Sequence, residues 1–224
     1  MSRRSTLRFS ALVLGAASAL AAGPPGIVLQ RISAPPPAAA APELRHLVAG
    51  EALRVAGPGR ISATFWLRAR IPEMKAAPDS SPVLGERIAL PGIPPAAFVG
   101  FVSFDRPWRD YRDRLVPAGV YTARYLVQPA IKEHKGASAF RDFLILTPAS
   151  IDVAADTSPR ELIGRSAAAT GSEHPLVMAV FPLPDGAHPP RILVNPLEQP
   201  MLGVRLGSLA FGIVFEGHGR TEET

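Results

Sequence analysis

The sequence contains no cysteine. This absence excludes disulfide bonds, zinc sites with thiolate ligands, a lipid-modified cysteine after an export signal and a disulfide-linked partner. The folded part must therefore be stabilised by its own apolar core. A chain of 224 residues is long enough to build one.

Common catalytic and nucleotide-binding motifs are also missing. The chain has no glycine-rich phosphate loop, no G-x-S-x-G nucleophile turn and no H-E-x-x-H zinc motif. The only asparagine, Asn195, precedes Pro196, so there is no acceptor for N-glycosylation. These absences argue against the most common classes of hydrolase and nucleotide-binding protein.

The positive charge is modest and scattered. The chain has 24 basic and 19 acidic side chains, a formal net charge of +5. Without Arg3, Arg4 and Arg8, which lie in the N-terminal segment, 21 basic side chains face 19 acidic ones, a net charge of +2. No basic stripe with interleaved aromatic residues is present, so nucleic acid is not an expected partner.

The N-terminal residues have the pattern of an export signal. A basic stretch precedes the apolar residues 9–20, and Ala19-Leu20-Ala21 fits the small-x-small rule of a signal peptidase. We predict a signal peptide over residues 1–22, with cleavage near Ala21 or Ala22 and the bacterial periplasm as destination. An uncleaved anchor, which would bring the protein into contact with the membrane, is the alternative, although Pro24 and Pro25 interrupt the apolar run.

Two regions are expected after the signal. Residues 23–42 are rich in alanine and proline, a composition that favours an extended linker. Residues 43–224 are expected to form a single β-sandwich domain.

Short apolar segments with the period of strands dominate this domain. Ile61, Ala63 and Phe65 alternate with polar residues, which predicts a half-buried strand. Residues 97–104 are apolar on both faces, which predicts a central strand in which Gly100 allows a close contact. If side chains alternate strictly along this strand, Val99 and Phe101 lie on one face, and the other face carries Phe98, Val102 and Phe104. Further strands are expected at residues 176–183, 191–195 and 202–216.

One helical insertion is expected around residues 158–170. Ser158, Pro159 and Glu161 have the spacing of a capping box, and Gly171 is a suitable C-terminal stop. The predicted fold class is therefore all-β, mainly an antiparallel β-sandwich, with this one short helix.

The most distinctive stretch covers residues 105–148. A charged, aromatic lead-in precedes a Pro-Ala-Gly turn, and strands are expected at residues 120–127 and 140–146. The two strands predict a β-hairpin whose connecting loop contains Glu133 and His134.

Two Glu-His pairs could supply metal ligands. Glu133-His134 lies in the hairpin loop, and Glu173-His174 follows the predicted helix. Imidazole and carboxylate groups are common ligands of divalent metals and common acid/base groups. Their spacing matches no known ligand pattern, and histidines hydrogen-bonded or solvated in loops are the alternative interpretation.

The lead-in of the hairpin could form a binding rim. Its expected members are Trp108, Arg109, Asp110, Tyr111 and Arg112, joined by Arg141 and Asp142 from the opposite strand. In this interpretation the two aromatic rings stack on a sugar or peptide and the arginines donate hydrogen bonds. The alternative is a loop held by local Arg-Asp pairs, with the rings covering the edge of the core.

Several segments resemble a family of uncharacterised exported bacterial proteins. The shared pattern comprises D-Y-R at residues 110–112, P-A-G-V-Y-T-x-R-Y at 117–125, Q-P at 128–129, H-x-G at 134–136, R-D-F-L at 141–144 and H-P at 174–175. Members of this family have an Asp-Gly-Asn-His-Met-Gly loop after Q-P, of which only His134 and Gly136 are present here. The resemblance implies no assigned reaction. It places His134 and His174 above the other histidines as site candidates.

Three classes of function follow from these observations. The leading hypothesis is a non-enzymatic binding or structural module that contacts an envelope protein or a glycan. The second is a metal-dependent or acid/base enzyme that uses His134 and His174, with a divalent metal as its cofactor. The third is a carbohydrate-binding module that uses Trp108 and Tyr111.

Overall fold

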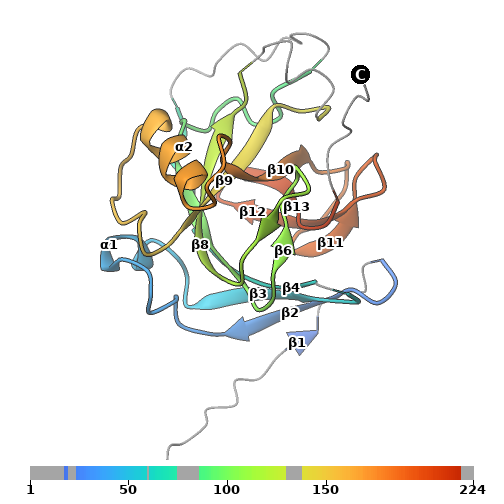
Figure 1. The fold of residues 1–224 in the computed structure, drawn as a ribbon. Coiled ribbons are helices and arrows are strands. Elements are labelled where there is room, and N and C mark those ends of the chain that lie inside the picture. The colour runs from blue at the N-terminus through green and yellow to red at the C-terminus, as the bar shows by residue number, and fades with distance from the viewer. Residues whose placement is uncertain (1–17, 20–23, 60, 75–85, 130–137, 218–224) are drawn as a thin grey trace, which may run out of the picture.

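A computed structural model describes residues 18–19, 24–59, 61–74, 86–129 and 138–217 of the chain. Eleven strands form one antiparallel sheet in the order β1-β2-β3-β4-β5-β8-β9-β10-β13-β12-β11, and β6 and β7 form a separate small hairpin (Figure 1). The strands of the large sheet are β1 (Ser18–Ala19), β2 (Val28–Ser33), β3 (Glu51–Ala56), β4 (Ser62–Leu67), β5 (Phe98–Phe104), β8 (Gly119–Val127), β9 (Asp142–Pro148), β10 (Leu176–Pro182), β11 (Arg191–Val194), β12 (Pro200–Leu206) and β13 (Leu209–Val214). The small hairpin consists of β6 (Trp108–Arg109) and β7 (Leu115–Val116).

The large sheet curls until its two ends approach each other. Strand β10 makes the corner, because it pairs with β9 through residues 176–179 and with β13 through residues 180–182. Strand β11 then comes close to β2. The predicted all-β fold is confirmed, and its strands form one nearly closed sheet rather than two separate ones.

The interior of this curled sheet is filled by side chains. Each long strand contributes inward-facing apolar residues, as expected from the two-residue period of a strand. Members of this cluster include Leu29, Val55, Phe65, Val102, Tyr121, Leu144, Met178, Ile192, Leu202 and Phe211. The interior is therefore a packed core.

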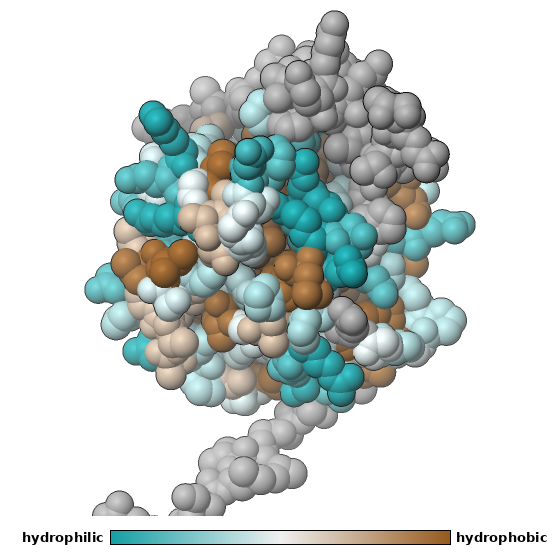
Figure 2. All heavy atoms as spheres, viewed as in Figure 1, coloured by the Kyte–Doolittle hydropathy of each residue, from teal (hydrophilic) through white to brown (hydrophobic). Residues whose placement is uncertain are grey.

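Two smaller apolar clusters cover the outside of the sheet. Helix α2 (Pro159–Ala168) lies beside β9, and its Leu162 is fully buried against outward-facing residues of β9 and β10. The short helix α1 (Pro42–Arg45) buries Leu44 against β3, β4 and β5. The outer surface drawn in Figure 2 shows hydrophobic residues in small patches separated by hydrophilic ones.

The elements with strong local signals lie where the sequence predicted them. Strands β8 and β9 form the predicted hairpin, with Tyr121 opposite Pro148 and Val127 opposite Asp142. Helix α2 begins at the predicted capping box, in which Ser158 accepts from the Glu161 amide and the Glu161 carboxylate accepts from the Ser158 amide. The helix is followed by Gly171 at φ +63°.

The linker predicted over residues 23–42 is wrong in part. Strand β2 lies inside that range and pairs with β3 along all six of its residues, and Leu29 is only 1% exposed. The prediction is based on the proline- and alanine-rich composition of the whole range, which does not indicate the strand at Val28–Ser33. Strand β1 falls within the predicted signal peptide, and cleavage of that segment stays a prediction.

Two further expectations about strands fail. The single strand expected over residues 202–216 is the hairpin β12–β13, since Gly207 (φ +70°) and Ser208 form a two-residue turn. In β5, the register shifts between Phe98 and Gly100, so that Phe98 and Phe101 both face outward while Val99 and Val102 face inward. A β-bulge of this kind breaks strict alternation.

Gly100 is the residue that allows β4 and β5 to approach each other. A Cβ atom at this position would lie 2.2 Å from the backbone oxygen of Trp66 and 2.9 Å from Cα of Leu67. Both obstacles are backbone atoms, which cannot rotate away.

We expect Gly100→Ala to lower the free energy of unfolding by roughly 1–3 kcal/mol or more, because the two central strands must separate. The matched control is Gly164→Ala, in the interior of α2, where nothing lies within 4 Å of an added Cβ. It should stabilise the protein by roughly 0.5–1 kcal/mol, because alanine loses less backbone entropy in a helix. Urea denaturation of both variants measures the difference. Equal unfolding midpoints would contradict the close contact at Gly100.

Candidate functional site

The two aromatic residues of the predicted binding rim belong to the core. Trp108 is 7% exposed, its indole stacks on Phe104 at a centroid distance of 4.6 Å, and its Nε1 donates to the carbonyl of Phe215 at 2.6 Å. Tyr111 is 3% exposed and packs edge-on against Phe143. Phe104 covers one face of the Trp108 indole, and Trp108 also contributes to the lining of the hollow described below. Neither ring is the exposed platform that the sequence suggested, and carbohydrate binding by these two residues stays a prediction.

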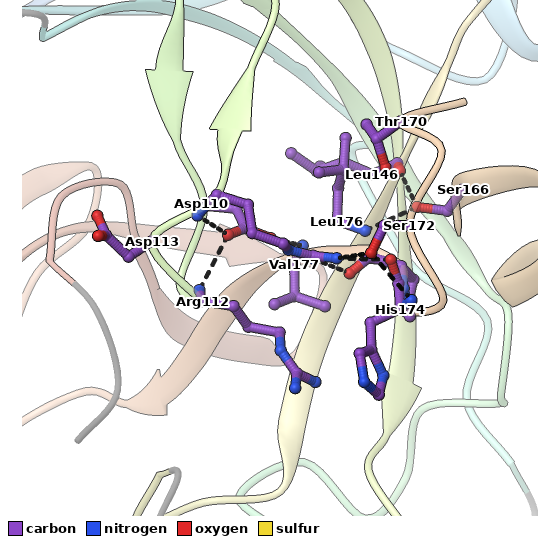
Figure 3. A network of polar contacts seen from close by, with 12 residues as sticks. Asp110, Arg112, Asp113, Leu146, Ser166, Thr170, Ser172, His174, Leu176 and Val177 are labelled. Carbon is purple, nitrogen blue, oxygen red and sulfur yellow. Dashed lines mark hydrogen bonds and ion pairs between the residues drawn. The ribbon is translucent and has the colours of Figure 1, made fainter. Parts of the chain in front are cut away.

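Asp110 holds the β6–β7 hairpin in place. Its side chain is fully buried, and its Oδ1 accepts from the backbone amides of Arg112 at 3.0 Å and Arg114 at 2.9 Å. The other oxygen, Oδ2, accepts from the Val177 amide of β10 at 3.2 Å and from the Arg114 guanidinium at 2.5 Å. Figure 3 shows this carboxylate between the hairpin turn and β10. The donors replace the water that the buried charge has lost.

Arg114 extends the same network to the segment after α2. Its guanidinium donates to Oγ of Ser172 at 3.0 Å, to the carbonyl of His174 at 2.6 Å and to the carbonyl of Pro175. The hairpin is thus tied to the large sheet by one buried ion pair and its hydrogen bonds. The interpretation of the lead-in as a loop held by Arg-Asp pairs is confirmed.

The tip of the hairpin is exposed. Arg109 forms an ion pair with Asp113 at 3.3 Å, and both side chains are more than half exposed. Arg112 also lies on the surface, and Leu115 is 54% exposed. Asp113 has φ +60°, a left-handed conformation that aspartate tolerates better than most residues.

A hollow of about 320 Å³ lies beside this hairpin, at one end of the curled sheet. Its lining comprises Ile61, Trp108, Arg109, Asp110, Asp113, Phe215, Glu216 and Gly217. The apolar part of the lining comes from Ile61, Trp108 and Phe215. Glu216 is exposed, and partial burial nevertheless raises the pKa of its carboxyl above the ordinary value.

Arg141 and Asp142 do not join the hairpin network, contrary to the prediction. Asp142 is fully buried and accepts from the amides of Ala89 and Leu90 at 2.6 and 2.9 Å and from the Tyr125 hydroxyl at 2.6 Å. Burial raises the pKa of Asp142, and these hydrogen bonds oppose the shift. Arg141 donates to the carbonyl of Gln128 at 2.8 Å. Both residues secure loops on another part of the sheet.

A third buried carboxylate was not singled out by the sequence. Asp152 pairs with Arg124 at 2.7 Å, and their side chains are 0% and 1% exposed. Thr122 donates to Asp152 at 2.6 Å, and Arg124 donates to the carbonyls of Ala96 and Ala155. Alternation along β8 places Arg124 on the outer face, and no local signal indicates that a loop covers it.

The predicted metal ligands are only partly described. Glu133 and His134 lie outside the described residues. Glu173 and His174 are exposed, and Figure 3 shows hydrogen bonds reaching the backbone of His174 while its imidazole extends away from them. Within the described ranges, no group of three or more histidine, aspartate or glutamate side chains could hold a metal ion. A metal site that includes His134 stays a prediction.

No protein-family model, curated protein or solved structure matches the chain. The resemblance to exported bacterial proteins therefore stays a prediction. In the part of the chain that the structure describes, no helix is long and apolar enough to cross a membrane.

We expect Asp110→Ala to lower the free energy of unfolding by about 3 kcal/mol or more, because the partly buried Arg114 would lose its counter-charge. Asp113→Asn is the control. Its ion pair is exposed and asparagine tolerates the left-handed conformation, so the change should stay below about 1 kcal/mol. Chemical denaturation checks both values. Similar losses for the two variants would show that Asp110 does not anchor the hairpin.

Proposed function

We propose that the protein is an exported, non-enzymatic binding module that accepts a basic side chain of an envelope protein. The proposed site is the hollow beside the β6–β7 hairpin. The N-terminal sequence pattern supports export, and the charges of the hollow support the choice of a basic ligand.

The observation that carries this proposal is the unbalanced carboxylate of Glu216. The other charges of the hollow are neutralised within the protein, since Arg109 pairs with Asp113 and Asp110 pairs with Arg114. Among the described residues, no cation lies within ion-pair distance of Glu216. Counted over the described residues of its lining, the hollow has a net negative charge, which favours a cationic ligand.

The apolar lining fits the remainder of such a side chain. Lysine and arginine have long methylene stems that bury well against apolar surface while the charged group stays in water. Trp108, Phe215 and Ile61 form the apolar part of the wall of the hollow, and Glu216 belongs to the same lining. The Asp110–Arg114 pair holds the hairpin wall of the hollow in place before binding, which reduces the entropy lost on association.

We expect Nα-acetyl-lysine methylamide, whose side-chain ammonium group is free, to bind in this hollow and to change the environment of Trp108. The chain has two tryptophans, so 5-fluorotryptophan labelling gives two fluorine NMR signals, which Trp66→Phe assigns. Only the Trp108 signal should shift on titration. Glu216→Gln should weaken binding about two- to fivefold, the range of an exposed ion pair.

Glu173→Gln is the matched control, because it removes the same charge from an exposed position of the hairpin-anchoring segment. Unchanged binding in this control with weakened binding in Glu216→Gln supports the site. Equal effects of the two substitutions, or a shift of the Trp66 signal alone, would overturn it.

Binding of the lysine probe should also depend on pH. The pKa of Glu216 is raised above its ordinary value of 4.5, so its charge is lost at a higher pH than for a free glutamate. Affinity should be complete well above this raised pKa and should fall as the pH decreases through it. Glu216→Gln should bind with an affinity that does not change in this range. The same fluorine titration at a series of pH values measures the effect.

A further inference from the structure

The large sheet has a seam where its two ends meet. Strand β11 pairs with β12 alone, and β2 pairs with β3 on one side. On its other side β2 pairs with β1 only at Gln30 and Arg31. In the described part of the chain, β2 and β11 are close but share no ladder of hydrogen bonds.

The segment that occupies this edge belongs to the predicted signal peptide. Strand β1 lies antiparallel to β2, with Ser18 opposite Arg31 and Ala19 opposite Gln30. Cleavage near Ala21 or Ala22 would remove β1 and leave the outer edge of β2 without a neighbour. The pairing with β1 shows that the geometry of this edge accepts an added antiparallel strand.

The strands at the seam have little of the usual protection against pairing. Edge strands of monomeric proteins commonly carry charged residues (especially lysine), proline or a bulge, which oppose the addition of another strand. Neither β2 nor β11 contains proline or lysine within its bounds, and each has a single charged residue, Arg31 and Arg191. Each instead has an exposed valine, Val28 at 46% and Val194 at 45%.

We propose that the exported protein binds an extended strand of a partner polypeptide at the edge of β2, in the position that β1 occupies. Backbone hydrogen bonds to β2 would supply affinity, and apolar side chains of the partner would cover Val28 and Val194. This inference rests on the export included in the proposed function and concerns a different surface from the hollow.

The closeness of β11 decides which occupant fits. Neighbouring strands of a sheet lie about 4.7–4.9 Å apart, so the edge strand of a second folded copy would bring its own neighbouring strands into the space of β11. A single extended segment needs room for one strand only, and the pairing of β1 with Gln30 and Arg31 shows that this part of the β2 edge provides it. A segment of a partner chain therefore suits the seam better than a second copy of this protein.

The experiment uses the full chain, produced with its leader and recovered after export. The photo-crosslinking residue p-benzoylphenylalanine replaces Val194, and Val153, which is 50% exposed on the β9–α2 connection, is the control position. We expect a covalent product with another polypeptide from position 194 and none from position 153. Val28→Lys should abolish this product, because an edge lysine blocks strand addition, whereas Val153→Lys should leave it unchanged.

A second pair of measurements guards against indirect effects. With the crosslinker at position 28, Val194→Lys should likewise abolish the product. Amide hydrogen exchange over residues 28–33 should slow about tenfold or more in the crosslinked complex, because strand pairing protects edge amides.

Four results would overturn the inference. The first is that the exported protein retains Ser18 and Ala19, and the second is that the crosslinked product contains only this chain. The third is that the product persists in both lysine variants. The fourth is that amide hydrogen exchange over residues 28–33 is unchanged in the crosslinked complex. Glu216→Gln separates the two proposals. A seam product that persists in Glu216→Gln while the lysine probe binds about two- to fivefold more weakly supports both proposals. A probe that binds without any seam product leaves only the hollow.

Discussion

A carboxylate that leaves water must be surrounded by donors of the protein, and this requirement positions the loops around the curled sheet. Asp110 gathers two amides of the hairpin turn, one amide of β10 and the guanidinium of Arg114. Asp142 holds the backbone at Ala89 and Leu90 in the same manner. In each case one buried carboxylate joins a segment with little regular structure to the large sheet, from the hairpin itself at Asp110 and from β9 at Asp142.

The burial of these carboxylates also limits which polar side chains are available to a ligand. Asp110 and Asp142 have the residue type of a catalytic or metal-binding group, yet their oxygens are occupied by donors of the protein. Among the described residues that line the hollow, Glu216 is the carboxylate without an ion-pair partner. Because the interior is filled by apolar side chains, we propose binding at two surface features of the sheet, the hollow and the seam.

The sequence predicted those elements whose signals are local. The capping box of α2 and the alternation of β8 and β9 each depend on neighbouring residues, and both are confirmed. The Gly207-Ser208 turn was equally local, and its dipeptide between apolar residues could have separated β12 from β13. The burial of Arg124 could not be predicted in this way. It depends on Asp152, which is distant in sequence and comes from a loop that folds over the sheet.

The ion pair of Arg124 and Asp152 has a further effect on the surface. Ile151 and Val153 flank this aspartate and are 44% and 50% exposed. The aspartate points inward to reach Arg124, and its two apolar neighbours are left partly in solvent. The exposure of these two residues is thus linked to an internal salt bridge, and an exposed hydrophobic pair of this kind is not by itself a sign of a binding site.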